Sequence, residues 1–140
     1  MNGMTRDVRI LADGIGILGS AACTLHCLVT PVLLVAGATL PASFLADDTF
    51  HRLLLWAILP ATIIALGLGY SQHKDGRILV LGFLGVVGIT SAFAAPHDLV
   101  GESGERFLTV GSAGLLIGAH LRNFNRCRAD RCNQEAARGW

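Results

Sequence analysis

Four long apolar runs, separated by short polar segments, dominate the pattern of the chain. They cover approximately residues 15–38, 53–70, 78–95 and 107–121. A membrane-spanning helix needs roughly 20 apolar residues, with a range of about 17–25. The first three runs meet this length, and the fourth needs residues at its ends to reach it. Because the connections are short, neighbouring helices should be antiparallel. The pattern predicts an all-α fold, an integral membrane bundle of four transmembrane helices.

The composition agrees with a chain embedded in a membrane. Of the 140 residues, 52% are hydrophobic and 15% are charged, and the mean hydropathy is +0.55. A soluble domain usually carries about 25% charged residues. The formal net charge of +1 gives no indication of nucleic-acid binding. We expect one four-helix transmembrane domain, residues 1–121, followed by a basic cytoplasmic tail, residues 122–140.

The positions of the cations predict the orientation in the membrane. Arg52 and Arg106 lie in the first and third loops, beside acidic residues. The other nine lie before the first run, between the second and third, or after the fourth: Arg6, Arg9, Lys74, Arg77, Arg122, Arg126, Arg128, Arg131 and Arg138. Cytoplasmic loops carry the excess of Lys and Arg, so we predict a multi-pass protein of the cytoplasmic (inner) membrane with both termini in the cytoplasm. The first run is longer than the core of a signal peptide, about 7–15 residues, so we expect it to be retained.

The segment Cys23–Cys27 places two thiols and an imidazole inside the first apolar run. Ionisable groups inside a membrane span usually mark a pathway or a ligand site. On a helix, Cys23, His26 and Cys27 occupy positions i, i+3 and i+4 and therefore share one face. The spacing predicts a soft-metal site or a redox pair on that face. Pro31 removes the helical hydrogen bond to the Cys27 carbonyl, so we expect a helix kink beside the thiols.

Charge and coordination number indicate which metal this site prefers. Sulfur ligands select soft cations, whereas zinc normally requires four tetrahedral ligands. In a low-dielectric setting the empty site should hold neutral thiols, so binding must release protons. A divalent cation with two thiolates is neutral, so mercuric ion fits best. Copper(I) is the alternative metal, if His26 is protonated or another cation lies nearby. The spacing also leaves open a disulfide between the two thiols, and simple packing.

A second cysteine pair, Cys127 and Cys132, follows the fourth run among Arg126, Arg128 and Arg131. Neighbouring arginines favour thiolates, and a structural disulfide is disfavoured in a reducing cytoplasm. We expect a metal exit or relay site, the alternative being a basic tail in which the cysteines are incidental. Further histidines near the membrane edges form a candidate path for the ion: His51, His73 and His120.

Glycines recur in the third and fourth apolar runs at spacings of three and four residues. Small residues allow helix backbones to approach closely in lipid. We therefore expect both sets to lie at contacts between helices. They are Gly82, Gly85 and Gly88, and Gly111, Gly114 and Gly118.

The chain resembles the MerC-type mercury-uptake membrane proteins of the MerC-domain family over nearly its whole length. The matching residues are Asp13-x-x-Gly16, Ser20-x-x-Cys23-x-x-His26-Cys27, Pro31, His51, His73 and His120-x-x-Asn123. The resemblance implies four transmembrane helices and inward transport of mercuric ion, with delivery to a cytoplasmic mercuric reductase. One departure is the Cys-x3-Cys spacing, since some mercury transporters of this kind carry closer or adjacent cysteines.

Together these features predict a passive metal carrier or channel and not an enzyme. The chain has no Gly-x4-Gly-Lys-Ser/Thr motif for ATP. We expect transported Hg²⁺ or another soft ion, no permanently bound cofactor, and as partners the lipid bilayer and a cytoplasmic reductase or low-molecular-weight thiols. Two alternatives belong to other classes: a membrane thiol-redox protein, and a metal-responsive membrane subunit that binds without translocating.

Overall fold

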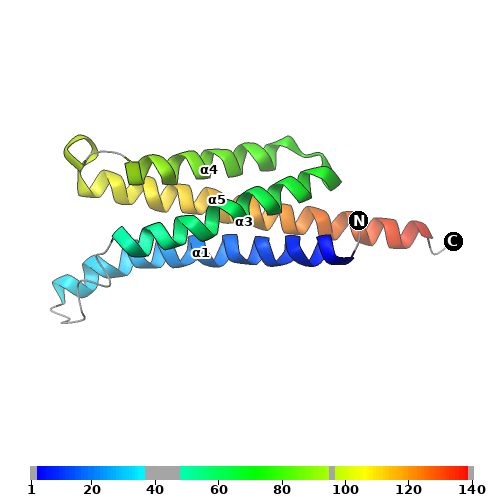
Figure 1. Ribbon diagram of the computed structural model, residues 1–140, viewed down its shortest axis with the longest axis horizontal. Coiled ribbons are helices and arrows are strands. Elements are labelled where there is room, and N and C mark those ends of the chain that lie inside the picture. The colour runs from blue at the N-terminus through cyan, green and yellow to red at the C-terminus, as the bar shows by residue number, and fades with distance from the viewer. Residues whose placement is uncertain (1–2, 37–47, 95–96, 139–140) are drawn as a thin grey trace.

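The computed structural model of the chain is a bundle of four long α-helices (Figure 1). It describes residues 3–36, 48–94 and 97–138, with the backbone alone at 34, 48–51, 97–100, 102 and 130–138. The helices are α1 (Gly3–Val35), α3 (Asp48–His73), α4 (Gly76–Ala94) and α5 (His97–Arg138). Within these ranges the chain forms helices and turns and no strand. The predicted all-α, four-helix fold is confirmed.

The surface of the bundle is that of a membrane protein. Among the described residues, three segments are long and apolar enough to cross a membrane: Gly3–Leu33, Arg52–His73 and Gly76–Ala94. The predicted fourth span lies within α5. Each helix also turns a large apolar side chain outward, and these side chains are between 67% and 80% exposed: Leu18, Trp56, Phe83 and Phe107. Exposed apolar surface of this extent suits contact with lipid.

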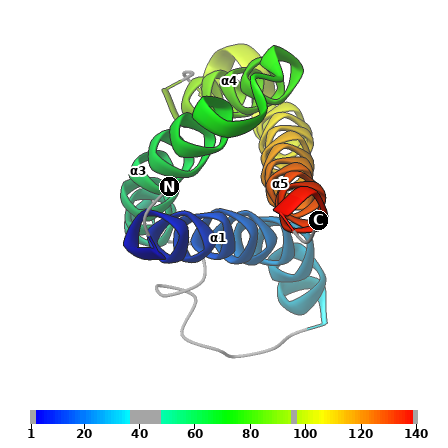
Figure 2. The same cartoon turned by 90° about the vertical axis from the view of Figure 1, so that its right-hand side faces the viewer.

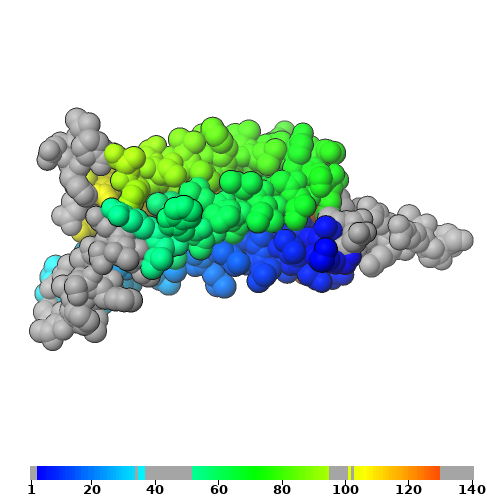
Figure 3. Space-filling model, in the orientation of Figure 1, coloured from blue at the N-terminus to red at the C-terminus, as the bar shows by residue number. Residues whose placement is uncertain are grey.

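The helices alternate in direction around the bundle. Figure 2 shows α1 and α4 on opposite sides, with α3 and α5 between them. The helix α5 packs against α1, α3 and α4. In the face shown in Figure 3, α1, α3 and α4 lie side by side along the length of the molecule. The start of α1, the α3–α4 turn and the last turns of α5 lie at one end (Figure 1), which we call the inner end.

A tight turn joins α3 to α4 at the inner end. Lys74 has a φ of 53°, and its N–H donates to the Tyr70 carbonyl at 3.0 Å, which ends α3 in the left-handed conformation common at helix C-termini. The Asp75 carboxylate then accepts the Arg77 N–H at 3.1 Å and caps the start of α4. The Asp75 N–H donates to Nδ1 of His73 at 3.0 Å. The turn therefore fixes the orientation of the His73 ring.

Two helix boundaries differ from the apolar runs. The helix α1 begins at Gly3 rather than near residue 15, and α5 continues through residues 122–138, which the sequence analysis assigned to a tail. Gly101, with φ 67° and ψ 162°, interrupts α5 near its start. Arg9, interpreted from the sequence as a cation in a cytoplasmic segment, lies inside the bundle and is 1% exposed. There it pairs with Asp13, one turn along α1.

The glycines of α4 lie at helix contacts, whereas those of α5 do not. A Cβ added at Gly82, Gly85 or Gly88 would collide with Leu66, Leu116 or Ser112, respectively. The prediction is confirmed for α4. At Gly111, Gly114 and Gly118 no atom of the described residues lies within 4 Å of such a Cβ, so the prediction for α5 was wrong within the bundle.

Gly85→Ala should lower the unfolding temperature of the purified protein, and Gly114→Ala should not. A Cβ at Gly85 would lie 2.7 Å from Cγ and 3.1 Å from the backbone nitrogen of Leu116, so α4 and α5 would have to move apart. Overpacking of this kind costs about 1–3 kcal/mol. Alanine at Gly114 meets open space and has the better helix propensity. Thermal unfolding in detergent, followed by circular dichroism, measures both variants. Equal loss in the two would contradict the α4–α5 contact.

Candidate metal site

The thiols and the buried charged and hydroxyl side chains of α1 lie on one face of the helix, which points into the bundle. The spacing along this face alternates between four and three residues, which keeps successive side chains on one side of a helix. We call these positions the inner stripe of α1: Arg9, Asp13, Gly16, Ser20, Cys23 and Cys27. All of them are buried except Cys27, which is partly buried. The stripe runs from the inner end to beyond the middle of the helix.

The two thiols of the stripe lie together in an apolar core. Cys23 is 2% exposed, and Cys27 packs against the hydrophobic cluster that contains it. Ile58, Ile89 and Leu116 surround Cys23 from three other helices. Both cysteines are free thiols. The bundle therefore holds two free thiols on one helix, of which Cys23 is buried and Cys27 is partly buried.

His26 does not join the two thiols as the spacing predicted. It is partly buried, and it lies outside the inner stripe. Nowhere in the described part of the chain do three or more His, Cys, Asp or Glu side chains come close enough to hold a metal ion. The structure thus brings two sulfurs together without a third ligand of these types. Such a site suits a cation that accepts two-coordinate binding and disfavours zinc.

Pro31 lies one turn beyond Cys27, inside α1. Because proline has no N–H, the Cys27 carbonyl lacks its helical donor at this position. The helix nevertheless continues to Val35. The carbonyl group therefore adds an oxygen acceptor next to the thiol pair.

Between the thiols and the inner end, Asp13 is the centre of a buried polar layer. The Asp13 side chain is 1% exposed. Arg9 Nη1 donates to Oδ2 of Asp13 at 3.4 Å, and His120 Nδ1 donates to Oδ1 at 2.9 Å. The Asn123 amide donates to both oxygens at 3.0 Å. Three side chains, one of them the Arg9 guanidinium, donate to the carboxylate, so each of its oxygens has two donors.

A chain of hydrogen bonds fixes the side chains around this carboxylate. Since Nδ1 of His73 accepts the Asp75 N–H, its Nε2 carries the proton and donates to Oδ1 of Asn123 at 3.0 Å. This orients the Asn123 amide nitrogen toward Asp13 and toward the Ala65 carbonyl, 3.1 Å away. The layer is therefore ordered from the α3–α4 turn inward to α1.

His120 has a partner on each ring nitrogen. Its Nδ1 is bound to Asp13, and its Nε2 lies 3.2 Å from the hydroxyl oxygen of Thr62 on α3. Two glycines make room for the polar layer, because a Cβ at Gly16 would overlap the His120 ring and one at Gly69 would overlap Asn123. These glycines have a packing role that their spacing in the sequence did not reveal.

Two buried polar atoms in the stripe have no hydrogen-bond partner among the described residues. They are the Ser20 hydroxyl oxygen and Nε of Arg9. Ser20 is fully buried, one turn from Cys23 on one side and one turn from Gly16 on the other. An unpartnered buried hydroxyl is unfavourable unless it serves a purpose that the resting structure does not include.

Of the remaining predicted site residues, the structure describes the side chain of Cys127 but not those of Cys132 and His51. Cys127 is buried, one turn beyond Asn123 on α5, and so lies at the inner end of the polar layer. Cys132 follows five residues later in the same helix. The side chains of His51 and Cys132 lie outside the described residues.

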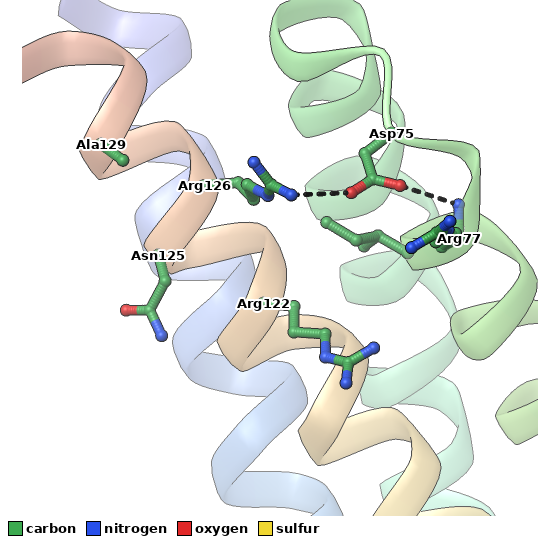
Figure 4. Close-up of a pocket in the computed structure, with 7 residues that line it drawn as sticks. Asp75, Arg77, Arg122, Asn125, Arg126 and Ala129 are labelled. Atoms are coloured by element: carbon green, nitrogen blue, oxygen red, sulfur yellow. Dashed lines mark hydrogen bonds and ion pairs between the residues drawn. The ribbon is translucent and has the colours of Figure 1, made fainter. Parts of the chain in front are cut away.

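A positively charged pocket of about 480 Å³ opens at the inner end, between the start of α4 and α5 (Figure 4). Arg126 Nη2 lies 3.6 Å from Oδ2 of Asp75, and this is the pocket's only ion pair among the described residues. Three arginines and one aspartate line the pocket, so its charge is positive. The lining residues are Asp75, Arg77, Ile78, Arg122, Asn125, Arg126 and Ala129.

The fold and the site define a multi-pass membrane protein with a shielded dithiol and a buried polar layer. Residues 13–125 match the family model described as MerC mercury resistance protein. The chain therefore belongs to the MerC mercury resistance protein family, whose members are membrane proteins of mercury resistance and transport. The match spans the thiol pair and the polar layer from Asp13 to Asn123, and Arg9 and Cys127 lie outside it. No curated protein and no solved structure matches the chain.

Reasoning from the chemistry of the residues found the thiols but not the polar layer. Asp13, Ser20 and Asn123 entered the sequence analysis only through the resemblance. Arg9 entered it only as a cation that predicts the orientation, and Thr62 had no role in it. A signal was present, because Arg9, Asp13 and Ser20 continue the spacing of Cys23 and Cys27 toward the inner end.

Proposed function

We propose that the chain carries mercuric ion across the cytoplasmic membrane into the cytoplasm, with Cys23 and Cys27 as the binding site in the middle of the path. The observation that carries this proposal is the free dithiol in a core formed by Ile58, Ile89 and Leu116. Two adjacent sulfurs without a third ligand suit the linear coordination that mercuric ion prefers. Membership of the MerC mercury resistance family supports the same ion.

Charge favours a divalent soft ion over copper(I). Two thiolates neutralise a divalent cation, and a neutral complex is the least costly in an apolar core. Copper(I) with two thiolates keeps one negative charge. The nearest buried cation on the stripe is Arg9, which is paired with Asp13. Copper(I) is therefore the second choice of metal.

On the inner side we propose that the ion passes the polar layer and reaches Cys127. His73 and His120, which the sequence analysis assigned to the path, lie in that layer. The pocket lined by Arg77, Arg122 and Arg126 gives this end a positive potential. It would attract acceptors that carry carboxylates or thiolates, such as low-molecular-weight thiols or a cytoplasmic reductase.

A thiol-redox function is the second candidate, because Cys23 and Cys27 are free thiols one helical turn apart and Cys27 packs against the cluster that contains Cys23. It predicts a reversible disulfide between them and an electron-accepting partner in the membrane. Mass spectrometry after alkylation distinguishes the two functions. A metal carrier should keep both thiols reduced during turnover, whereas a redox protein should cycle them.

The proposal is tested by measuring metal uptake in cells with and without the chain, using mercury, copper, zinc and cadmium in parallel. We expect intracellular mercury to rise several-fold with the chain and zinc to remain unchanged. A matched control expresses the Cys23→Ser, Cys27→Ser variant at the same level. Equal mercury uptake with and without the chain would reject transport. Binding by the purified protein in that case would support the metal-responsive subunit.

Both termini should be cytoplasmic. The inner end gathers the start of α1, the α3–α4 turn and the end of α5, and therefore most of the cations (Figure 1). Reporter fusions after Arg77 and after Trp140 should read cytoplasmic, and a fusion near Glu102 should read external. An external reading at Trp140 would overturn this orientation and the handover at Cys127.

Replacing Cys127 and Cys132 together with serine should slow the release of the ion without removing its binding site. Cys127 lies at the inner end, away from the core that holds Cys23. We expect the purified variant to keep one mercuric ion per chain, at Cys23 and Cys27. Uptake should fall, most strongly in cells depleted of glutathione. Loss of binding at Cys23 and Cys27 in this variant would mean that the four cysteines form one shared site.

A further inference from the structure

We propose that His120, held by Asp13, accepts and returns the proton that a thiol of the Cys23–Cys27 pair loses when it binds a metal ion, with the Ser20 hydroxyl as the step between them. This inference rests on the proposed function, since it names the base of the metal-binding step. As the sulfur–metal bond forms, the S–H bond breaks and its electron pair stays on sulfur. One proton moves to Nε2 of His120. The second leaves on a basic ligand of the incoming ion, such as hydroxide or a thiolate.

The hydrogen bonds of His120 suit both of its protonation states. Its Nδ1–H is bound to Asp13 at 2.9 Å, which leaves Nε2 as the site of proton exchange. The partner of Nε2 is the Thr62 hydroxyl at 3.2 Å. A hydroxyl can donate to neutral imidazole or, after rotation, accept from imidazolium. No buried atom of this pair is left unsatisfied in either state.

The groups around His120 come from α1, α3 and α4. On α1, the Arg9 cation and the Asp13 anion form a pair, and on α3 the ring of His73 lies beyond Asn123. The buried residues of α4 are apolar or glycine, and Asp75 lies in the turn beyond His73. A proton received by His120 would therefore face a carboxylate that the Arg9 guanidinium and the Asn123 amide already orient. A carboxylate that orients a histidine and stabilises its charged form is a recurring arrangement in proton transfer.

Ser20 supplies the connection between the thiols and the imidazole. His120 packs against the backbone at Gly16, and Gly16 lies two helical turns, a rise of about 10 Å, from Cys23. That separation is too large for direct proton transfer. Ser20 lies between them on the same stripe, fully buried and without a hydrogen-bond partner among the described residues. Its hydroxyl can accept from a thiol and donate toward Nε2 of His120, directly or through one water.

The test measures how fast the purified full-length chain binds mercuric chloride in stopped flow, using the ultraviolet absorption of the mercury–thiolate bond. Cys127→Ser and Cys132→Ser are present throughout, so that only the membrane pair binds. In this background His120→Gln should still bind one ion per chain, at least tenfold more slowly, since proton transfer by a positioned base contributes about 10²–10⁴-fold. Added imidazole should restore part of the rate. Ser112→Ala is the control, because it removes a buried hydroxyl on α5 that is not part of the relay. This variant should bind mercuric ion at the original rate.

Two outcomes overturn the relay while the proposed function stands. One is His120→Gln binding as fast as Ser112→Ala. The other is slow binding that imidazole does not restore, which would indicate a structural role of His120. If His120→Gln does not fold, Ser20→Ala provides the same test, because Ser20 gives up no hydrogen bond of the resting structure. It should bind several-fold more slowly, and an unchanged rate rejects the relay. If the unmodified pair binds no mercuric ion, the proposed function fails, and the relay fails with it.

Discussion

Cys23→Ser and Cys27→Ser should each remove most mercury uptake, and the double variant should lose little more. A two-coordinate site cannot hold a soft ion with one sulfur, so either change removes the site. Serine keeps the size and the helix but offers a hard oxygen in place of a soft sulfur. Changes in the outer shell of metal sites already cost about 10–100-fold in affinity, so a loss of at least about tenfold is expected for a ligand. Accumulation of mercury in intact cells measures it.

The controls for this prediction separate ligation from packing. Ala21→Ser introduces the same side chain in the same helix but outside the inner stripe, and uptake should be unchanged. Cys23 is also part of the core, so its serine variant needs a check of stability by thermal unfolding. Losses that add up across the two cysteines, with metal binding retained, would show that the thiols only pack.

His26→Ala tests whether the ion uses a third ligand. The structure does not gather His26 with the thiols into a three-ligand group. With mercuric ion, which two sulfurs satisfy, the variant should keep most of the uptake. A loss as large as that of Cys23→Ser would show that His26 joins the site when the ion is bound, and would favour a metal of higher coordination number.

The helices were predictable because their apolar runs are long, and a bilayer leaves helices as nearly the only choice for such runs. Their ends were less predictable. In the sequence, Arg9 and Asp13 have the polar character expected beside a span, so the first apolar run was predicted to begin after them. In the structure they are buried inside it. Whether a charged pair ends a span or lies within one depends on partners from other helices, and hydropathy along one segment does not contain that information.

The thiols were predictable for a different reason, since their chemistry is local. Cys23 and Cys27 are one turn apart on one helix, so spacing alone brings them together. The polar layer depends on distant residues. Asp13 is 107 residues from His120 and 110 residues from Asn123 in the sequence. Neither a motif nor a helical period connects positions that far apart, so only the packing of α1 against α5 shows that they meet.

The two glycine patterns illustrate the same limit. The glycines of α4 and of α5 recur with equal regularity, yet only those of α4 face another helix of the bundle. By contrast, Gly16 and Gly69 belong to no obvious repeat, and each leaves space for a polar side chain of α5. A small residue in a membrane helix permits a close approach, but the sequence does not tell which surface approaches.

Asp13→Asn should be the most destabilising single change in the polar layer. It leaves the Arg9 guanidinium buried without its anion, and it places an amide where His120 and Asn123 both need an acceptor. Removing one partner of a buried ion pair costs about 3–5 kcal/mol. We expect the purified variant to unfold at a much lower temperature and to accumulate poorly in the membrane. Thermal unfolding in detergent and the yield of membrane-inserted protein measure the two effects.

Asp7→Asn is the matched control, because Asp7 lies on the same helix and is exposed. Surface substitutions of this kind usually change stability by less than about 0.5 kcal/mol. Neutralising both partners, in Arg9→Gln with Asp13→Asn, should recover part of the loss because no unpaired charge is then buried. The remaining deficit would report the hydrogen bonds from His120 and Asn123. If Asp13→Asn unfolds at the temperature of Asp7→Asn, the carboxylate does not hold the layer together, and the arrangement described around Asp13 is wrong.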